Sequence, residues 1–151
     1  MKYDVIVVFL FGLPMDSPRN LKLAERAASL SNNLGVPIFD ESAFVESMGW
    51  HDGNGAPWIS STLKFAKALA KEGANKRWKN ALVIAAPCHV WRCVRDLRQF
   101  GLYAKADKFF IGARFYDKNS EHWWTRCASL WWIRELSLRL MPWWLYSRIA
   151  G

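Results

Sequence analysis

Two side chains that could hold an anion lie near each other in residues 85–92, the segment Ala-Ala-Pro-Cys-His-Val-Trp-Arg. Pro87 and Cys88 form a predicted turn before a helical pattern, so His89 lies at the start of that helix and Arg92 shares its first turn. Backbone amides at a helix start, with an imidazole and a guanidinium, form a suitable cradle for an anion. The segment therefore predicts an anion site, with His89 as hydrogen-bond donor or acid–base group.

The same segment has a simpler interpretation that involves no ligand. His89 would cap the helix, and Arg92 would pair with Asp96 at the surface. The residue pattern alone favours this interpretation, because short motifs often occur by chance. Cys88 beside His89 also suggests a Cys/His nucleophile, but adjacent side chains rarely point at each other and no third orienting group is evident.

The histidines and cysteines have no spacing that is typical of a metal site. The three histidines are scattered, and no two cysteines have the separation of paired metal ligands. The apolar run near the N-terminus is too short for a signal peptide and follows Asp4. We therefore expect a cytoplasmic protein whose cysteines, Cys88, Cys93 and Cys127, are reduced thiols.

Apolar runs alternate with helical patterns, and these are the elements that would position the site. Strands are expected at residues 5–11, 36–39, 81–86 and 108–111. Helices are expected after each of them, at residues 18–34, 60–70, 90–100 and 121–140. This alternation predicts right-handed crossovers, and hence one α/β domain over residues 1–151 with a mainly parallel sheet covered by helices.

Local signals predict where two of these helices end and which residues face the sheet. Ser17 and Pro18 are a typical N-cap and first helical position, and Gly35 is a typical stop. Gly73 is the expected stop of the second helix. The apolar residues at helical spacing in these helices are Leu21, Ala24, Ala28, Leu34, Leu63, Ala66 and Leu69.

Ligands of open parallel sheets bind outside the carboxyl ends of the strands, near helix N-termini. This rule gathers residues that are scattered in the sequence. They are Gly12 after the first predicted strand, Asp40 and Glu41 after the second, Cys88, His89 and Arg92 after the third, and Arg114 after the fourth. Asp40 and Glu41 could form a catalytic pair or hydrogen-bond a ribose, and a solvated strand end is an equal alternative.

Residues 82–101 resemble the YdcF/SanA/ElyC-like family of bacterial proteins, which are Rossmann-like domains of largely unassigned function. Its members carry an apolar strand, a small turn, and then a His followed three residues later by an Arg, as at His89 and Arg92. Further similarities are Phe11-Gly12, Glu41 and Thr62 as an upstream acid and a helix-starting Thr, and Trp132-Ile133-Arg134-Glu135-Leu136 as an Arg-Glu helix. The resemblance implies a three-layer Rossmann-like fold with about four to five strands.

The resemblance also implies a nucleotide-like or phosphorylated ligand, such as S-adenosylmethionine, and a link to envelope metabolism. Arg92 would clamp the anion and Glu41 would accept a hydroxyl, in a site lined by Gly12, Glu41, Thr62, Cys88, His89 and Arg92. The chain departs from the family at positions that would hold the ligand, with Ala85-Ala86 in place of a Thr-Ser turn and Lys64-Phe65 in place of a Glu-Asn pair. We therefore expect the fold to be kept while the ligand, or any activity, has changed.

The net charge of +8 favours acidic partners, which include nucleic acids, phosphorylated ligands and anionic membrane surfaces. No nucleic-acid recognition motif is present. The basic residues that a nucleic acid could use are Lys71, Lys76, Arg77, Lys79, Arg95 and Arg98, with Trp78 and Trp91 available for stacking.

Three tryptophan pairs mark a C-terminal helix that is predicted over about residues 121–148. The favoured interpretation packs this helix on the sheet or against a second copy of the chain. The alternative is an anchor at a membrane surface, with the tryptophans at headgroup depth beside Arg134, Arg139 and Arg148. Charged residues interrupt the apolar stretch, so the helix is not expected to cross a bilayer.

Two functions therefore stay open. One is a small Rossmann-like domain that binds an anionic, nucleotide-like ligand, with no reaction specified. The other is a non-enzymatic basic interaction module, attached to a membrane or a protein partner through the tryptophan-rich helix. In the glycine-rich segment 47–57, His51 and Asp52 belong either to a lid with acid–base groups or to a solvated turn.

Overall fold

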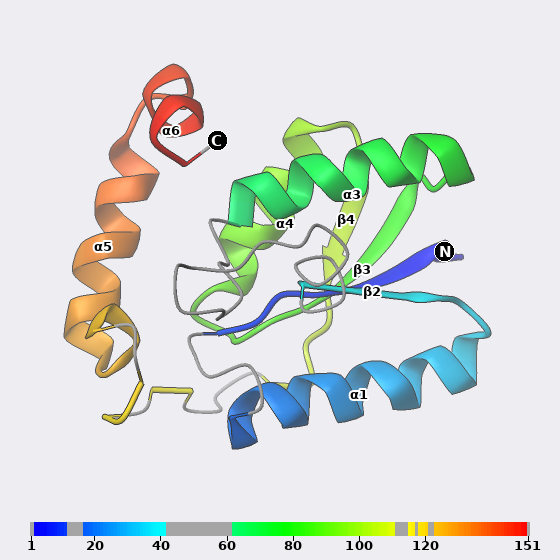
Figure 1. Ribbon diagram of the computed structural model, residues 1–151, viewed down its shortest axis with the longest axis horizontal. Helices are drawn as coiled ribbons and strands as arrows, with labels where there is room; N and C mark the ends of the chain where they lie inside the picture. The colour runs from blue at the N-terminus through cyan, green and yellow to red at the C-terminus, as the bar shows by residue number, and fades with distance from the viewer. Residues whose placement is uncertain are drawn as a thin grey trace, which may run out of the picture.

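Four parallel strands form one sheet at the centre of the computed structural model (Figure 1). The structure describes residues 2–11, 17–41, 62–110, 115–116, 118–120 and 123–150. The strands lie in the order β2-β1-β3-β4, and all three neighbouring pairs are parallel. Their bounds are β1 Val5–Val8, β2 Ile38–Asp40, β3 Asn80–Ile84 and β4 Tyr103–Ala106.

Helices cover both faces of this sheet (Figure 1). α1 (Pro18–Leu34) lies on one face, and α3 (Thr62–Lys76) and α4 (Val90–Gln99) lie on the other. Beyond a short 3-10 helix, η1 (Trp123–Thr125), the helices α5 (Ala128–Leu140) and α6 (Trp143–Ala150) stand at the carboxyl ends of the strands. The predicted α/β class with a parallel sheet is confirmed, and the layers are those of a three-layer Rossmann-like fold.

The central strands are apolar throughout because helices pack against both of their faces. Val5 and Val7 of β1 belong to the core cluster that includes Phe65 and Leu69 of α3. Ile6 and Val8 belong to the opposite cluster, which includes Leu23 of α1 and Trp131 of α5. α5 therefore contributes to the same core as the first strand.

The fourth strand lies at Tyr103–Ala106 and not in the predicted range 108–111, of which residues 108–110 are described and are not a strand, while Ile111 lies outside the described residues. An edge strand of this kind buries only Ala104 and exposes Tyr103 and Lys105, so it lacks the apolar run that marks a central strand. Phe109 and Phe110 form a turn instead. The guanidinium of Arg26, which is ion-paired with Asp107, lies 4.3 Å from the centre of the Phe109 ring.

The predicted start and end of α1 are confirmed, but the hydroxyl of Ser17, predicted to cap the helix, makes no capping hydrogen bond, and the predicted inner face is wrong. Pro18 begins the helix, and Gly35 ends it with a left-handed φ of 65°. Leu23 and Ala27 face the core, whereas Leu21 is 50% exposed. The spacing of the apolar residues predicted the wrong face because the buried stripe also includes a polar residue, Asn20. Oδ1 of Asn20 accepts a hydrogen bond from the Phe11 amide.

Two further helix predictions need correction. Gly73 does not end α3, which continues to Lys76, and Gly73 is buried inside the helix. The C-terminal helix predicted over about residues 121–148 is three elements, since Cys127 has an extended backbone and Pro142 separates α5 from α6. Proline cannot donate the backbone hydrogen bond that a continuous helix would need at this position. Among the residues that the structure describes, no helix is long and apolar enough to cross a membrane.

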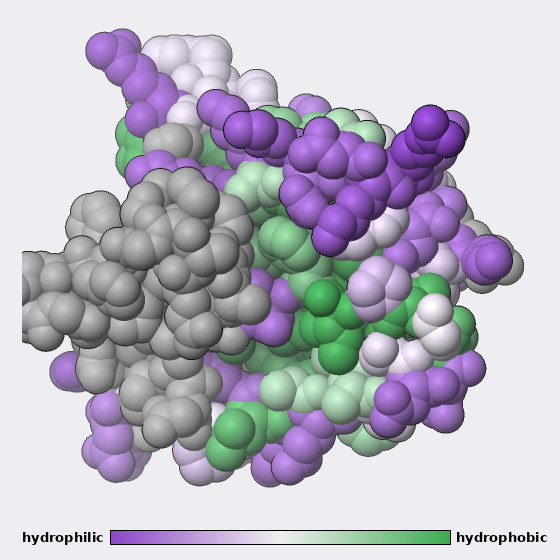
Figure 2. All heavy atoms as spheres, turned by 45° about the vertical axis from the view of Figure 1, so that its right-hand side comes forward, coloured by the Kyte–Doolittle hydropathy of each residue, from purple (hydrophilic) through white to green (hydrophobic). Residues whose placement is uncertain are grey.

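The described residues cover the edge of the sheet at β2 only in part. Figure 2 shows apolar side chains exposed between the hydrophilic outer surfaces above and below them. Ile38 of β2 is 38% exposed, as expected of an outermost strand. The interior of the sheet lies at β1 and β3.

The two leucines of α1 offer a direct test of which face is buried. Leu23→Ala should lower the free energy of unfolding by about 2–5 kcal/mol, because it leaves a cavity in the core. Leu21→Ala should change it by no more than about 0.5 kcal/mol, because that side chain is half exposed. Urea denaturation of both variants measures this difference, and the reverse order would contradict the packing of α1.

Candidate functional site

Polar side chains gather where the chain leaves β1, β2 and β3. The strand order places β1 and β3 side by side, while the connection from β1 leads to β2 on the other side. Such a switch point, at the carboxyl ends of the strands, is the usual ligand site of open α/β sheets. Glu41 follows β2 directly, and His89 follows β3 by way of a turn.

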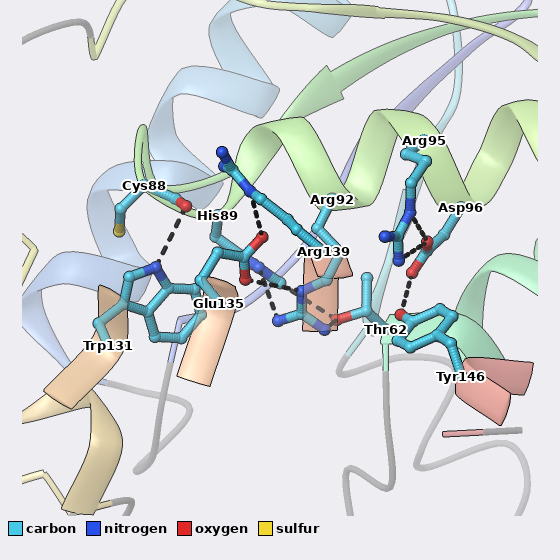
Figure 3. A network of polar contacts seen from close by, with 10 residues as sticks. All are labelled: Thr62, Cys88, His89, Arg92, Arg95, Asp96, Trp131, Glu135, Arg139 and Tyr146. Carbon is cyan, nitrogen blue, oxygen red and sulfur yellow. Dashed lines mark hydrogen bonds and ion pairs between the residues drawn. The ribbon is translucent and has the colours of Figure 1, made fainter. Parts of the chain in front are cut away.

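Arg92 is the centre of this group, as Figure 3 shows. Its Nη1 donates to Oγ1 of Thr62 at 3.1 Å, and its Nη2 donates to Nδ1 of His89 at 3.1 Å. Nε2 of His89 lies 3.4 Å from the same Thr62 oxygen. Arg92 is only 3% exposed, so α3, α4 and the turn after β3 meet on one buried guanidinium.

The charge of Arg92 is neutralised from α5. Its Nε donates to Oε2 of Glu135 at 3.1 Å, and Glu135 is fully buried. The other carboxylate oxygen, Oε1, lies 3.6 Å from Nε of Arg139 and has no hydrogen-bond partner among the described residues. A buried acceptor of this kind is where a water molecule or a ligand hydroxyl would bind.

Trp131, one turn before Glu135, fixes α5 against the end of β3. Its Nε1 donates to the carbonyl oxygen of Cys88 at 3.2 Å (Figure 3). Its ring lies 5.4 Å from the imidazole of His89 and 4.7 Å from the ring of Phe11, measured between ring centres. Trp131 and Glu135 together bring α5 against the switch point.

The hydrogen bonds of His89 determine its tautomer. A guanidinium can only donate, so Nδ1 accepts from Arg92 and the proton of the neutral ring is on Nε2. Burial lowers the pKa of His89 well below 6.5, and the charges of Arg92 and Arg134 lower it further. His89 is therefore a neutral donor toward Thr62, and its predicted role in proton transfer stays a prediction.

Positive charge predominates around this cluster. Burial and the charge of Arg92 together lower the pKa of Arg134 to about 10, against the opposite effect of Glu135. The part of this lowering that Arg92 causes reflects repulsion between two guanidinium groups, which a bound anion would reduce.

Glu41 is buried at 4% exposure and accepts a hydrogen bond from the Leu10 amide at 3.0 Å. Burial raises its pKa to about 7, although the Leu10 amide and the charge of Arg92 both lower it. The side chain thus exchanges a proton near neutral pH. The Leu10 amide, which lies just beyond the end of β1, thus donates to a carboxyl group that can itself both donate and accept hydrogen bonds.

Cys88 contributes a backbone carbonyl to the site rather than a nucleophile. Burial raises the pKa of its thiol to about 11, so the thiol stays protonated near neutral pH. Among the described residues, no group of three or more His, Cys, Asp and Glu side chains could hold a metal ion.

A second polar cluster fixes α6 to α4. Asp96 is fully buried, accepts the Tyr146 hydroxyl at 2.5 Å and pairs with Arg95 at 2.8 Å (Figure 3). Burial raises the pKa of Asp96, against the effect of both partners. The simpler interpretation of the sequence is therefore wrong, because Arg92 pairs with Glu135 and not with Asp96, and His89 makes no side-chain cap.

The structure brings together five of the predicted site residues, Glu41, Thr62, Cys88, His89 and Arg92, of which Cys88 takes part through its backbone carbonyl. Gly12, His51, Asp52 and Arg114 lie outside the described residues. Glu135 and Trp131 were not predicted as site residues. One signal could have identified Glu135, since it is the only acidic residue after residue 121 in a segment with several arginines.

Comparisons with protein-family models, with curated proteins and with solved structures give no match for this chain.

Glu135→Gln tests whether this carboxylate neutralises Arg92. Removing one partner of a buried ion pair leaves the other charge uncompensated, so the free energy of unfolding should fall by about 3–5 kcal/mol. Arg139→Gln is the matched control, and should cost less than about 1 kcal/mol because Arg139 is partly exposed. Equal losses in urea denaturation would show that Arg139, and not Arg92, is the main partner of Glu135.

Glu41→Gln should remove a pH dependence of stability. The pKa of Glu41 is raised from 4.5 to about 7 on folding, so the folded state holds its proton more tightly and this contribution is lost as pH rises through that range. One pKa unit is about 1.4 kcal/mol, so the stability of the wild type relative to Glu41→Gln should fall by up to about 3 kcal/mol.

Urea denaturation of both proteins at about pH 4.5 and pH 7.5 measures this change. The opposite pH dependence of His89 is present in both proteins and cancels in the comparison. A constant difference between them would contradict the raised pKa of Glu41.

Proposed function

We propose that this chain binds an anionic small molecule, phosphorylated or nucleotide-like, at the carboxyl ends of β1 and β3. The observation that carries the proposal is the buried Arg92, held at the switch point by Thr62, His89 and Glu135. Burying such a group is costly, and apolar residues of similar volume are often more stabilising. Buried polar clusters with shifted pKa values are enriched at functional sites, which supports a ligand here.

Each side chain has a role that follows from its hydrogen bonds. Arg92 supplies the positive charge, and Glu135 is a positioning residue that fixes the guanidinium plane. Thr62 Oγ1 accepts from both Arg92 and His89, which leaves the hydroxyl hydrogen to donate to an oxygen of the ligand. These donors suit phosphate or carboxylate oxygens.

Acceptors beside the donors narrow the class of ligand. Oε1 of Glu135 and the carboxyl group of Glu41 can accept hydroxyl groups, as a ribose or another sugar would provide. A phosphorylated sugar, a nucleotide and S-adenosylmethionine all combine an anionic group with hydroxyls. The resemblance to the YdcF/SanA/ElyC-like family supports the same class of ligand.

A thermal-shift screen against phosphate, nucleotides, sugar phosphates and S-adenosylmethionine tests the proposal. A ligand at about one hundred times its Kd stabilises by about 2.7 kcal/mol, which raises Tm by roughly 2–4 °C at this size. Thr62→Val removes the donating hydroxyl with little change in shape, and should abolish the shift.

Lys76→Ala is the control for general attraction of anions, because Lys76 is exposed at the other end of α3 from Thr62. It should keep the full shift. The proposal is wrong if no ligand shifts the wild type, or if Thr62→Val and the wild type shift equally.

A further inference from the structure

Most of the large apolar side chains that are exposed among the described residues lie in the last elements of the chain. On α5 they form a stripe within an arc of about 100°, on the side away from Trp131 and Glu135. On α6 they are Trp144, which lies on the opposite side of the helix from the buried Tyr146, and Ile149, which follows Tyr146 by three residues. We call this set the outer face, and its residues are Trp132, Ile133, Leu136, Leu140, Trp144 and Ile149, which are 49% to 76% exposed.

The exposed charged residues of residues 123–150, the segment that carries the outer face, are all positive. Residues 123–150 contain one acidic residue, Glu135, which is buried toward Arg92. They also contain four arginines, of which Arg126, Arg139 and Arg148 are exposed. The guanidinium of Arg139 lies 4.4 Å from the ring of Trp91 and 5.4 Å from that of Trp132, measured to the ring centres.

We propose that the outer face docks on the surface of a bilayer that contains anionic lipid. Tryptophan is favoured at headgroup depth, and arginines beside it attract anionic headgroups. α5 and α6 follow each other along one margin of the molecule (Figure 1), and each is too short to span a bilayer. They would lie in the plane of the interface.

The charges favour a bilayer over a second copy of the chain. In a symmetric dimer through the outer face, arginines would meet arginines, and the single acidic residue of this segment is already paired internally. Anionic headgroups provide the opposite charge that a second copy lacks. The net charge of +8 also attracts the whole molecule to an anionic bilayer and repels a second copy of the chain.

Flotation with vesicles of phosphatidylcholine, with and without about 30% phosphatidylserine, tests the docking. The wild type should float with the anionic vesicles, and bind neutral vesicles at least about fivefold more weakly. Leu140→Ser with Trp144→Ser should abolish flotation. The matched control, Leu21→Ser with Tyr103→Ser, changes exposed apolar residues elsewhere and should float like the wild type.

A charge reversal isolates the electrostatic part. Arg148→Glu should weaken binding to the anionic vesicles at least about fivefold, whereas Lys71→Glu on α3 should change it less. All these side chains are exposed, and an unchanged Tm shows that each variant is folded. The proposal is overturned by equal binding to neutral vesicles, by equal loss in the control variants, or by self-association through the outer face without vesicle binding.

Discussion

The buried ion pair between Arg92 and Glu135 joins two parts of the molecule that lie 43 residues apart in sequence. Neither partner could be buried alone, because an isolated charge in a protein interior is strongly unfavourable. Arg92 in turn orients His89 and Thr62 through its other nitrogens. The arrangement of the switch point therefore depends on where α5 lies.

The cluster of Asp96, Arg95 and Tyr146 plays a corresponding part for α6. A buried carboxylate on α4 again receives a donor from the C-terminal part of the chain. Two consecutive turns of α4 thus point a charged residue, Arg92 and then Asp96, toward the last helices. Polar contacts of this kind restrict α5 and α6 to one placement more strictly than apolar packing does.

The parts of the fold that could be predicted are those whose signal lies in the local sequence. The central strands were predicted because β1 and β3 are buried on both faces, which imposes uniform apolar runs. β4 was misplaced because an edge strand has no uniform apolar run. Phe109 and Phe110 belong to an apolar run, but they form a turn and not a strand. The inner face of α1 was missed because Asn20 replaces an apolar residue in the buried stripe.

The same limit applies to the site. The rule for strand ends brought Glu41 and His89 together because it depends only on topology. Glu135 could not be assigned in this way, since its role arises from a contact with a residue 43 positions earlier. The pKa of Glu41 likewise follows from burial, which only the folded chain provides.

The separation of Arg92 from Glu135 also has a consequence for how the protein is made. A ribosome delivers β1, β3 and α4 before α5, which carries the carboxylate that pairs with Arg92. The buried ion pair between Arg92 and Glu135 therefore cannot form until α5 has been synthesised. The switch point can thus reach its native arrangement only after both α4 and α5 are present.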